Sequence, residues 1–225
     1  MKRMSKPTAK LDTIGDRVCT YFGILDAARE EGLRLSRDSI RFSANAIRAV
    51  HRKEYDQAKE LIKSSQACIE GMSKKLGDHG ELYYGGFVHN AQKEYAEACI
   101  TFALVFGEAI PDPEELGVSY AAYLNGLGEA AGEMRRHLLD SLREGSIERC
   151  DGVLESMDDI YGLLVTIDFH DALTGGLRRT TDMVRGVLER TRGDLTIALR
   201  QQHLERKLEL FEAAWRNRPH EGRGR

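Results

Sequence analysis

Hydrophobic residues recur at intervals of three and four along most of the chain, which is the spacing of an amphipathic helix. The clearest case lies within residues 86–107, where the apolar positions that share one helix face are Phe87, Ala91, Ala98, Phe102 and Val105. The same spacing predicts further helices over residues 10–50, 55–76, 120–143, 147–164, 172–192 and 194–215. Only residues 163–169 resemble a β-strand, and this run is short and lacks alternation. An all-α bundle of about seven helices in one domain is therefore expected.

Small and polar residues predict where these helices begin and end. Asp112 precedes Pro113 and two acidic residues, which is the pattern of a helix start. Within the first helix, Gly32 and Ser36 allow either one long helix with a kink or two helices that meet there. Gly193 is expected to separate the last two helices.

The composition fits a soluble folded protein and limits the classes of function. Of the 225 residues, 41% are hydrophobic and 31% are charged, and the net charge is -3. A surface that binds nucleic acid would therefore have to come from local clustering of basic residues. We expect residues 1–9 to form a flexible basic tail, residues 10–216 a helical domain, and residues 217–225 a disordered tail.

The cysteines and the distribution of apolar residues indicate a cytoplasmic protein. The four cysteines lie far apart, with no C-x-x-C pair, at Cys19, Cys68, Cys99 and Cys150. This spacing predicts free thiols rather than a disulfide framework or a zinc site. No apolar segment follows the basic N-terminus, and no run approaches the ~18 apolar residues of a transmembrane helix. We therefore expect neither a signal peptide nor contact with a membrane.

A group of arginines follows one face of the first predicted helix. They fall within a narrow arc, away from the apolar side, and are Arg34, Arg37, Arg41, Arg48 and Arg52. Because a guanidinium binds phosphate through two parallel hydrogen bonds, this face is a candidate phosphate-binding surface. A solvated helix face would show the same pattern, and the sequence alone leaves both interpretations open.

Two pairs of glutamates are candidates for a metal site. Glu94 continues the apolar stripe of residues 86–107, and Glu97 lies one turn further on the same face. Glu129 and Glu133 share a face of residues 120–143 and are surrounded by glycine and alanine. If the two helices pack face to face, four carboxylates meet, and such a cluster requires a cation. Oxygen ligands alone suit Mg²⁺ or Mn²⁺, and a metal beside an arginine face indicates phosphodiester hydrolysis.

Other interpretations of these glutamates were weighed. A di-iron site would need Glu-x-x-His motifs, and His137 stands at the wrong offset from Glu133. The chain contains no Walker A loop, no G-x-G-x-x-G motif and no serine hydrolase elbow. The remaining alternative is structural, with the glutamates in salt bridges to Lys93, Arg135 or Arg136.

Three segments, taken in order and spacing, resemble the translin family: LYYGGFVHNAQKEYAEA, EELGVSYAAYLNGLGEAAGEMRRHLLDSLREG and YGLLVTIDFHDALTGGLRRTTDMVRGVLERTRGDL. The resemblance covers about residues 30–200. It is strongest to the short prokaryotic, chiefly archaeal members and to the catalytic subunit type, translin-associated factor X. It implies an all-α fold, a hollow octamer-like homo-oligomer, and binding of single-stranded RNA or DNA on the inner surface.

The resemblance also implies a choice between two subunit types. Catalytic subunits cut RNA endonucleolytically with Mg²⁺ held by an E-x-x-E pair and an acid-x-x-x-Glu pair, whereas translin itself lacks these acids. Here Glu94 and Glu97 match the first pair, and Glu129 and Glu133 match the second. Catalytic members usually carry aspartate where this chain has Glu129, and the extra methylene puts the rate of cleavage in doubt. The arginine face falls in the region that the family uses for nucleic acid.

The sequence therefore predicts a Mg²⁺-dependent endoribonuclease that acts on single-stranded RNA inside a homo-oligomeric shell. The alternative is a nuclease-silent protein that only binds single-stranded nucleic acid. A third and weaker interpretation is a helical scaffold for other proteins. Glu129 distinguishes the first two interpretations, because a catalytic site requires the Glu129 carboxylate to lie close to those of the other glutamates.

Overall fold

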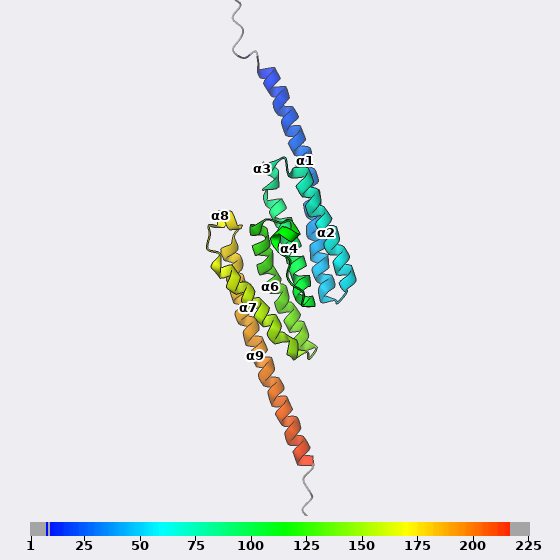
Figure 1. Ribbon diagram of the computed structural model, residues 1–225, viewed down its shortest axis with the longest axis vertical. Coiled ribbons are helices and arrows are strands. Elements are labelled where there is room, and N and C mark those ends of the chain that lie inside the picture. Colours follow the sequence, from blue (N-terminus) through cyan, green and yellow to red (C-terminus); the bar gives the residue numbers. More distant parts are fainter. Residues whose placement is uncertain (1–7, 9, 217–225) are drawn as a thin grey trace, which may run out of the picture.

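The computed structural model describes residue 8 and residues 10–216, and every regular element among them is helical (Figure 1). The long helices are α1 (Leu11–His51), α2 (Tyr55–Leu76), α4 (Gly86–Phe106), α6 (Tyr120–Arg143), α7 (Cys150–Thr166) and α9 (Leu177–Arg216). The short ones are α3 (Gly80–Tyr83), α5 (Pro113–Leu116), the 3-10 turn η1 (Ile147–Arg149) and α8 (Asp171–Thr174). The predicted all-α fold is confirmed, and the strand-like run 163–169 forms a helix end and a loop. The two predicted tails lie outside the described residues.

Helix α1 is continuous over 41 residues, so of the two alternatives for this segment the single helix is correct. Gly32 is buried inside the helix, and a Cβ at this position would lie 2.8 Å from Leu76 Cδ1. Ser36 caps no helix; its hydroxyl donates a hydrogen bond to the carbonyl oxygen of Phe87 at 2.9 Å. Both residues therefore serve the close packing of α1 against its neighbours rather than a helix break.

Helix α9 is also continuous, so the prediction of two helices separated at Gly193 is wrong. An interior glycine costs a helix only about 1 kcal/mol. Here Thr191 and Leu195 are buried on either side of it, and Arg135 of α6 donates to Asp194 at 2.7 Å. These tertiary contacts outweigh the local preference of glycine. For this reason the part of the chain that the structure describes has six long helices rather than seven.

Local sequence signals account for several of the helix starts. At α5, the Asp112 side chain accepts from the Glu115 amide, the Glu115 side chain accepts from the Asp112 amide, and Pro113 occupies the first turn. This confirms the predicted start. At α6, the Ser119 hydroxyl accepts from the amide of Ala122. Helix α9 begins only after a turn in which Gly175 and Gly176 both have positive φ.

The long helices pack side by side across the molecule. Helix α1 lies against α2 and α4, α4 lies against α6, and α6 lies against α7 and α9 (Figure 1). The backbones of α4 and α6 approach closely, since a Cβ at Gly126 would lie 2.6 Å from the Lys93 carbonyl oxygen and 3.0 Å from the Glu97 nitrogen. Glycine at this position lets the two backbones meet, and it therefore sets how close the glutamates of α4 and α6 come.

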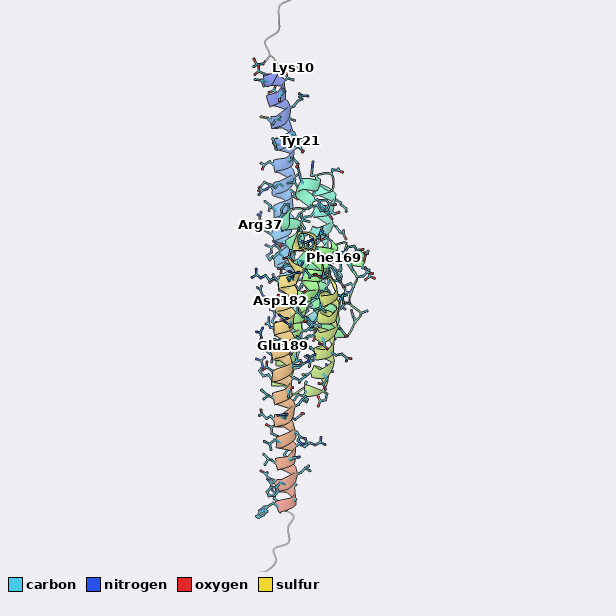
Figure 2. All side chains as sticks on the ribbon, turned by 90° about the vertical axis from the view of Figure 1, so that its left-hand side faces the viewer. Lys10, Tyr21, Arg37, Phe169, Asp182 and Glu189 are labelled. Atoms are coloured by element: carbon cyan, nitrogen blue, oxygen red, sulfur yellow. The ribbon has the colours of Figure 1, made fainter. Side chains whose placement is uncertain are left out.

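Both terminal helices extend beyond the packed body. Figure 2 shows α1 and α9 along the same side of the molecule, each projecting past it at an opposite end. Several apolar side chains on these projections are exposed to solvent: Leu11, Ile14 and Val18 on α1, and Leu204, Leu208 and Phe211 on α9. No helix among the described residues is long and apolar enough to cross a membrane. All four cysteines are free, as predicted.

Candidate metal and nucleic-acid site

Glu94, Glu97 and Glu129 form a compact acidic cluster between α4 and α6, which we call the acidic triad. One carboxylate oxygen from each residue lies within 4.8 Å of those of the other two. Glu97 is the innermost, with 8% of its surface exposed, whereas Glu94 and Glu129 are half-buried. The carboxylate of Glu129 therefore meets those of α4, although aspartate is usual at this position in catalytic translin-like subunits. Three carboxylates at this separation can hold a metal ion.

The electrostatics of Glu97 show how unfavourable the triad is without a bound cation. Burial, reinforced by the charges of Glu129, Glu94 and Glu133, raises the pKa of Glu97 to about 8. The carboxyl therefore holds a proton at neutral pH unless a cation compensates its charge. Metal binding would release that proton, since a metal ligates the ionised carboxylate.

Lys93 supplies one compensating cation from the protein itself. Its Nζ lies 2.6 Å from Glu129 Oε1 and 3.4 Å from Glu94 Oε1. Burial acts to lower the pKa of Lys93, but the hydrogen bond and charge of Glu129 outweigh it and raise the pKa overall, so the ammonium stays charged. The salt bridges that the sequence offered as a structural alternative are thus present in part. Lys93 pairs with two of the glutamates, whereas Arg135 pairs with Asp194.

Glu133, the fourth glutamate of the predicted site, does not join the triad within 4.8 Å. The His51 Nε2–H donates to Glu133 Oε2 at 2.5 Å, and Arg136 lies 4.0 Å from the same oxygen. The hydrogen bond from His51 lowers the pKa of Glu133, so this carboxylate is ionised at neutral pH. The His51 side chain is only 3% exposed. Because 82 residues separate His51 from Glu133, no local signal in the sequence predicted this pair.

The five arginines that are predicted to bind phosphate, four on α1 and Arg52 directly after it, are all exposed, as a binding surface requires, but most have acidic or polar partners. Arg34 pairs with Glu31 and Asp38, Arg41 pairs with Asp38, Arg48 bonds to Asn45, and Arg52 pairs with Glu54. Arg37, marked on α1 in Figure 2, makes no side-chain ion pair or hydrogen bond with any residue that the structure describes. The role of the arginines in binding nucleic acid stays a prediction.

The C-terminal end of the arginine face is close in sequence to His51, the residue that bonds to Glu133. Arg48 lies three residues before His51, and Arg52 lies directly after it.

Comparison with known proteins places the chain in a family. It is 30% identical over 192 residues to the uncharacterized protein MJ0175 of Methanocaldococcus jannaschii, over 83% of this chain and 85% of that protein. It also superimposes on AfC3PO in a complex with duplex RNA, with a TM-score of 0.75 and 32% identity, over 84% of this chain and 96% of AfC3PO. The chain belongs to the C3PO family of translin-like proteins. The resemblance to the translin family is thereby confirmed.

Two further C3PO structures are similar to the chain. The crystal structure of AfC3PO matches with a TM-score of 0.74 and 32% identity, again over 84% of this chain and 96% of AfC3PO. Apo-NeC3PO matches with a TM-score of 0.74 over 86% of this chain and 100% of its own, but at 22% identity this likeness shows the fold alone. No protein-family model matches the chain.

Proposed function

We propose that this C3PO-family chain is a Mg²⁺-dependent endoribonuclease whose metal is held by Glu94, Glu97 and Glu129. The observation that carries the proposal is the acidic triad, in which the buried carboxylate of Glu97 lies within 4.8 Å of two others and has a pKa that burial and these neighbours raise. The oxygen-only donor set suits Mg²⁺ or Mn²⁺. That AfC3PO was solved with duplex RNA supports RNA as the substrate class.

The bound metal would supply positive charge to a phosphate oxygen and to an attacking water. The protein groups around it have separable tasks. Glu94, Glu97 and Glu129 would hold the ion, and Glu133 is an ionised carboxylate near them that could take a proton from water. His51 fixes the Glu133 carboxylate through its hydrogen bond and is therefore a positioning residue.

The direct test is a cleavage assay on end-labelled RNA, in single-stranded and duplex form, with Mg²⁺ and with EDTA. We expect internal cuts that depend on Mg²⁺. The sequence favours single-stranded substrates, whereas the AfC3PO complex brings duplex RNA into consideration, so both forms belong in the assay. Absence of internal cuts on both forms in the presence of Mg²⁺ and Mn²⁺ would refute the proposal.

A second candidate function, nucleic-acid binding without cleavage, is favoured by one observation. The ion pair between Lys93 and Glu129 already satisfies part of the acidic triad, and Glu129 replaces the usual aspartate of catalytic subunits. Salt-sensitive RNA binding without cleavage would support this candidate. The variant Glu129→Asp would then test whether restoring the shorter acid restores cleavage.

We expect Arg37→Gln to weaken RNA binding more than Arg34→Gln does. Arg37 has no side-chain partner among the described residues, whereas Arg34 already pairs with Glu31 at 2.8 Å and Asp38 at 3.2 Å. Loss of one phosphate contact should reduce the slope of log affinity against log salt by about 1. The measurement is fluorescence anisotropy of labelled RNA over a series of salt concentrations. An unchanged slope for Arg37→Gln would show that Arg37 does not contact an RNA phosphate.

We also propose that copies of this chain assemble into a homo-oligomeric shell. The exposed apolar rows on the projecting ends of α1 and α9 support this, because such rows on a soluble protein mark contact surfaces. The double variant Leu204→Glu and Leu208→Glu should lower the mass measured by light scattering, while the exposed polar change Glu205→Gln should leave it unchanged. A monomeric unaltered protein, or an unchanged mass in the double variant, would contradict the proposal.

A further inference from the structure

Lys93 occupies the space that a cation bridging the triad would take. Its ammonium lies within 3.4 Å of both Glu94 and Glu129, and therefore between two of the three carboxylates. The side chain is 19% exposed, so water screens these contacts only in part. A Mg²⁺ ion binds oxygen at about 2.1 Å and repels an ammonium held this close. Lysine and metal therefore compete for the same oxygens.

The same lysine also lines a cavity, together with Glu129 of the triad. The cavity has a volume of about 550 Å³, within the range of small-ligand sites, and lies between α4, α6 and the turn from α8 to α9. Its polar lining also includes His89, Asn90, Asp171, Arg179 and Thr180. The Arg179 side chain is exposed and makes no ion pair or hydrogen bond with any other residue described in the structure. The cavity therefore holds an uncommitted cation beside the acidic site.

We infer that Lys93 is a tethered cation that competes with the metal ion for the acidic triad and, once displaced, binds an RNA phosphate in this cavity together with Arg179. The inference rests on the proposed metal site and adds a specific role for two residues. Lysine is suited to such a change of partner, because its ammonium is a compact charge on a flexible four-carbon stem. Lys93 already lines the cavity, so the cavity is the nearest polar environment for the displaced ammonium.

This arrangement couples metal binding to RNA binding. Metal must displace Lys93 from Glu94 and Glu129, which weakens metal affinity, but the displacement makes a phosphate-binding cation available. RNA that engages Lys93 removes it from the triad and so favours metal binding. The two effects are equal by thermodynamic linkage. The site would thus load its metal most readily when RNA is present.

The first test measures metal affinity without any reference to activity. Titration calorimetry with Mn²⁺ compares the unaltered protein with Lys93→Met, which keeps the length of the stem but removes the charge. We expect Lys93→Met to bind Mn²⁺ about 5-fold or more tightly, a typical size for a coupling between sites. Lys93→Arg keeps the charge and should stay near the unaltered affinity. Lys63→Met, which removes the exposed pair with Glu60 on α2, is the matched control and should have no effect.

The outcomes separate this inference from the proposed function. If Glu97→Gln abolishes Mn²⁺ binding but Lys93→Met does not tighten it, the metal site stands and the role of Lys93 is refuted. If the unaltered protein binds no Mn²⁺, both are refuted. Thermal unfolding in EDTA verifies that each variant is folded before titration.

The second test measures the coupling itself. Anisotropy of a labelled single-stranded RNA is recorded with EDTA and with Ca²⁺, an oxygen-binding cation, and a gel verifies that the RNA is intact. The unaltered protein and the control Lys63→Met should both gain RNA affinity of about 5-fold or more when Ca²⁺ is added. Lys93→Met and Arg179→Gln should not show this gain. An equal gain in these variants would overturn the displacement of Lys93 into the cavity.

Discussion

Replacing Glu97 by glutamine is expected to reduce RNA cleavage by about 1000-fold or more while leaving RNA affinity nearly unchanged. Glu97 is the most buried member of the acidic triad, and glutamine has its shape but no negative charge with which to hold Mg²⁺. Loss of the ion removes several kcal/mol of transition-state stabilisation. In our proposal RNA binding depends instead on the arginine face of α1, and Glu97→Gln removes no arginine from that face.

The measurement is single-turnover cleavage of labelled RNA in Mg²⁺, with anisotropy of the same RNA for affinity. Glu60→Gln, on the exposed face of α2, is the matched control, since it makes the same chemical change far from the triad. Glu94→Gln should behave like Glu97→Gln. Unchanged cleavage in Glu97→Gln, or loss of RNA binding together with cleavage, would refute the assignment of Glu97 as a metal ligand.

In EDTA, the free energy of unfolding is expected to fall as the pH rises from about 5 to about 8. The pKa of the Glu97 carboxyl rises from 4.5 to about 8 on folding, because of burial and the charges of Glu129, Glu94 and Glu133, against which Lys93 acts only in part. Between these values the folded protein keeps a proton that the unfolded chain has released. Stability must therefore decrease with increasing pH over this window, by about 3 to 5 kcal/mol in total.

Urea unfolding at a series of pH values checks this expectation. Glu97→Gln should lose most of the pH dependence, and saturating Mg²⁺ should stabilise the unaltered protein most at the upper end of the window, where the carboxylate is ready to bind it. Glu133 acts in the opposite direction, since His51 lowers its pKa, and its contribution is lost only as the pH falls below the usual carboxyl range. Burial lowers the pKa of His89 and of His137, which adds stability as the pH rises in the lower part of this window. The same pH dependence in Glu97→Gln as in the unaltered protein would therefore show that Glu97 does not contribute as described.

Most of the fold follows from local patterns in the sequence. The apolar spacing of residues 86–107 predicts α4, and the Asp112–Pro113 pair predicts the start of α5. The pattern failed at Gly193, where the predicted break is absent because buried neighbours and the Arg135–Asp194 ion pair hold α9 together. Those contacts come from α6, and a helix propensity that is read locally contains no information about them.

The candidate site, like the fold, could be predicted from the sequence only in part. Spacing alone puts Glu94 beside Glu97 on one helix face and Glu129 beside Glu133 on another, and the resemblance to the translin family identifies both pairs as acids of a catalytic subunit. The structure brings Glu129 to the α4 pair through the close contact at Gly126. It directs Glu133 to His51 instead, and this partner could not be predicted because the two residues are 82 positions apart.

The sequence by itself therefore determined the helices, the pairs of acids and the family, because each depends on residues a few positions apart or on their order along the chain. The tertiary structure decided which three carboxylates lie within 4.8 Å of one another and that Lys93 pairs with two of them. These outcomes depend on how α1, α4 and α6 pack. A separation of a few ångströms between side chains on different helices is set by the whole interface, and no local pattern specifies it.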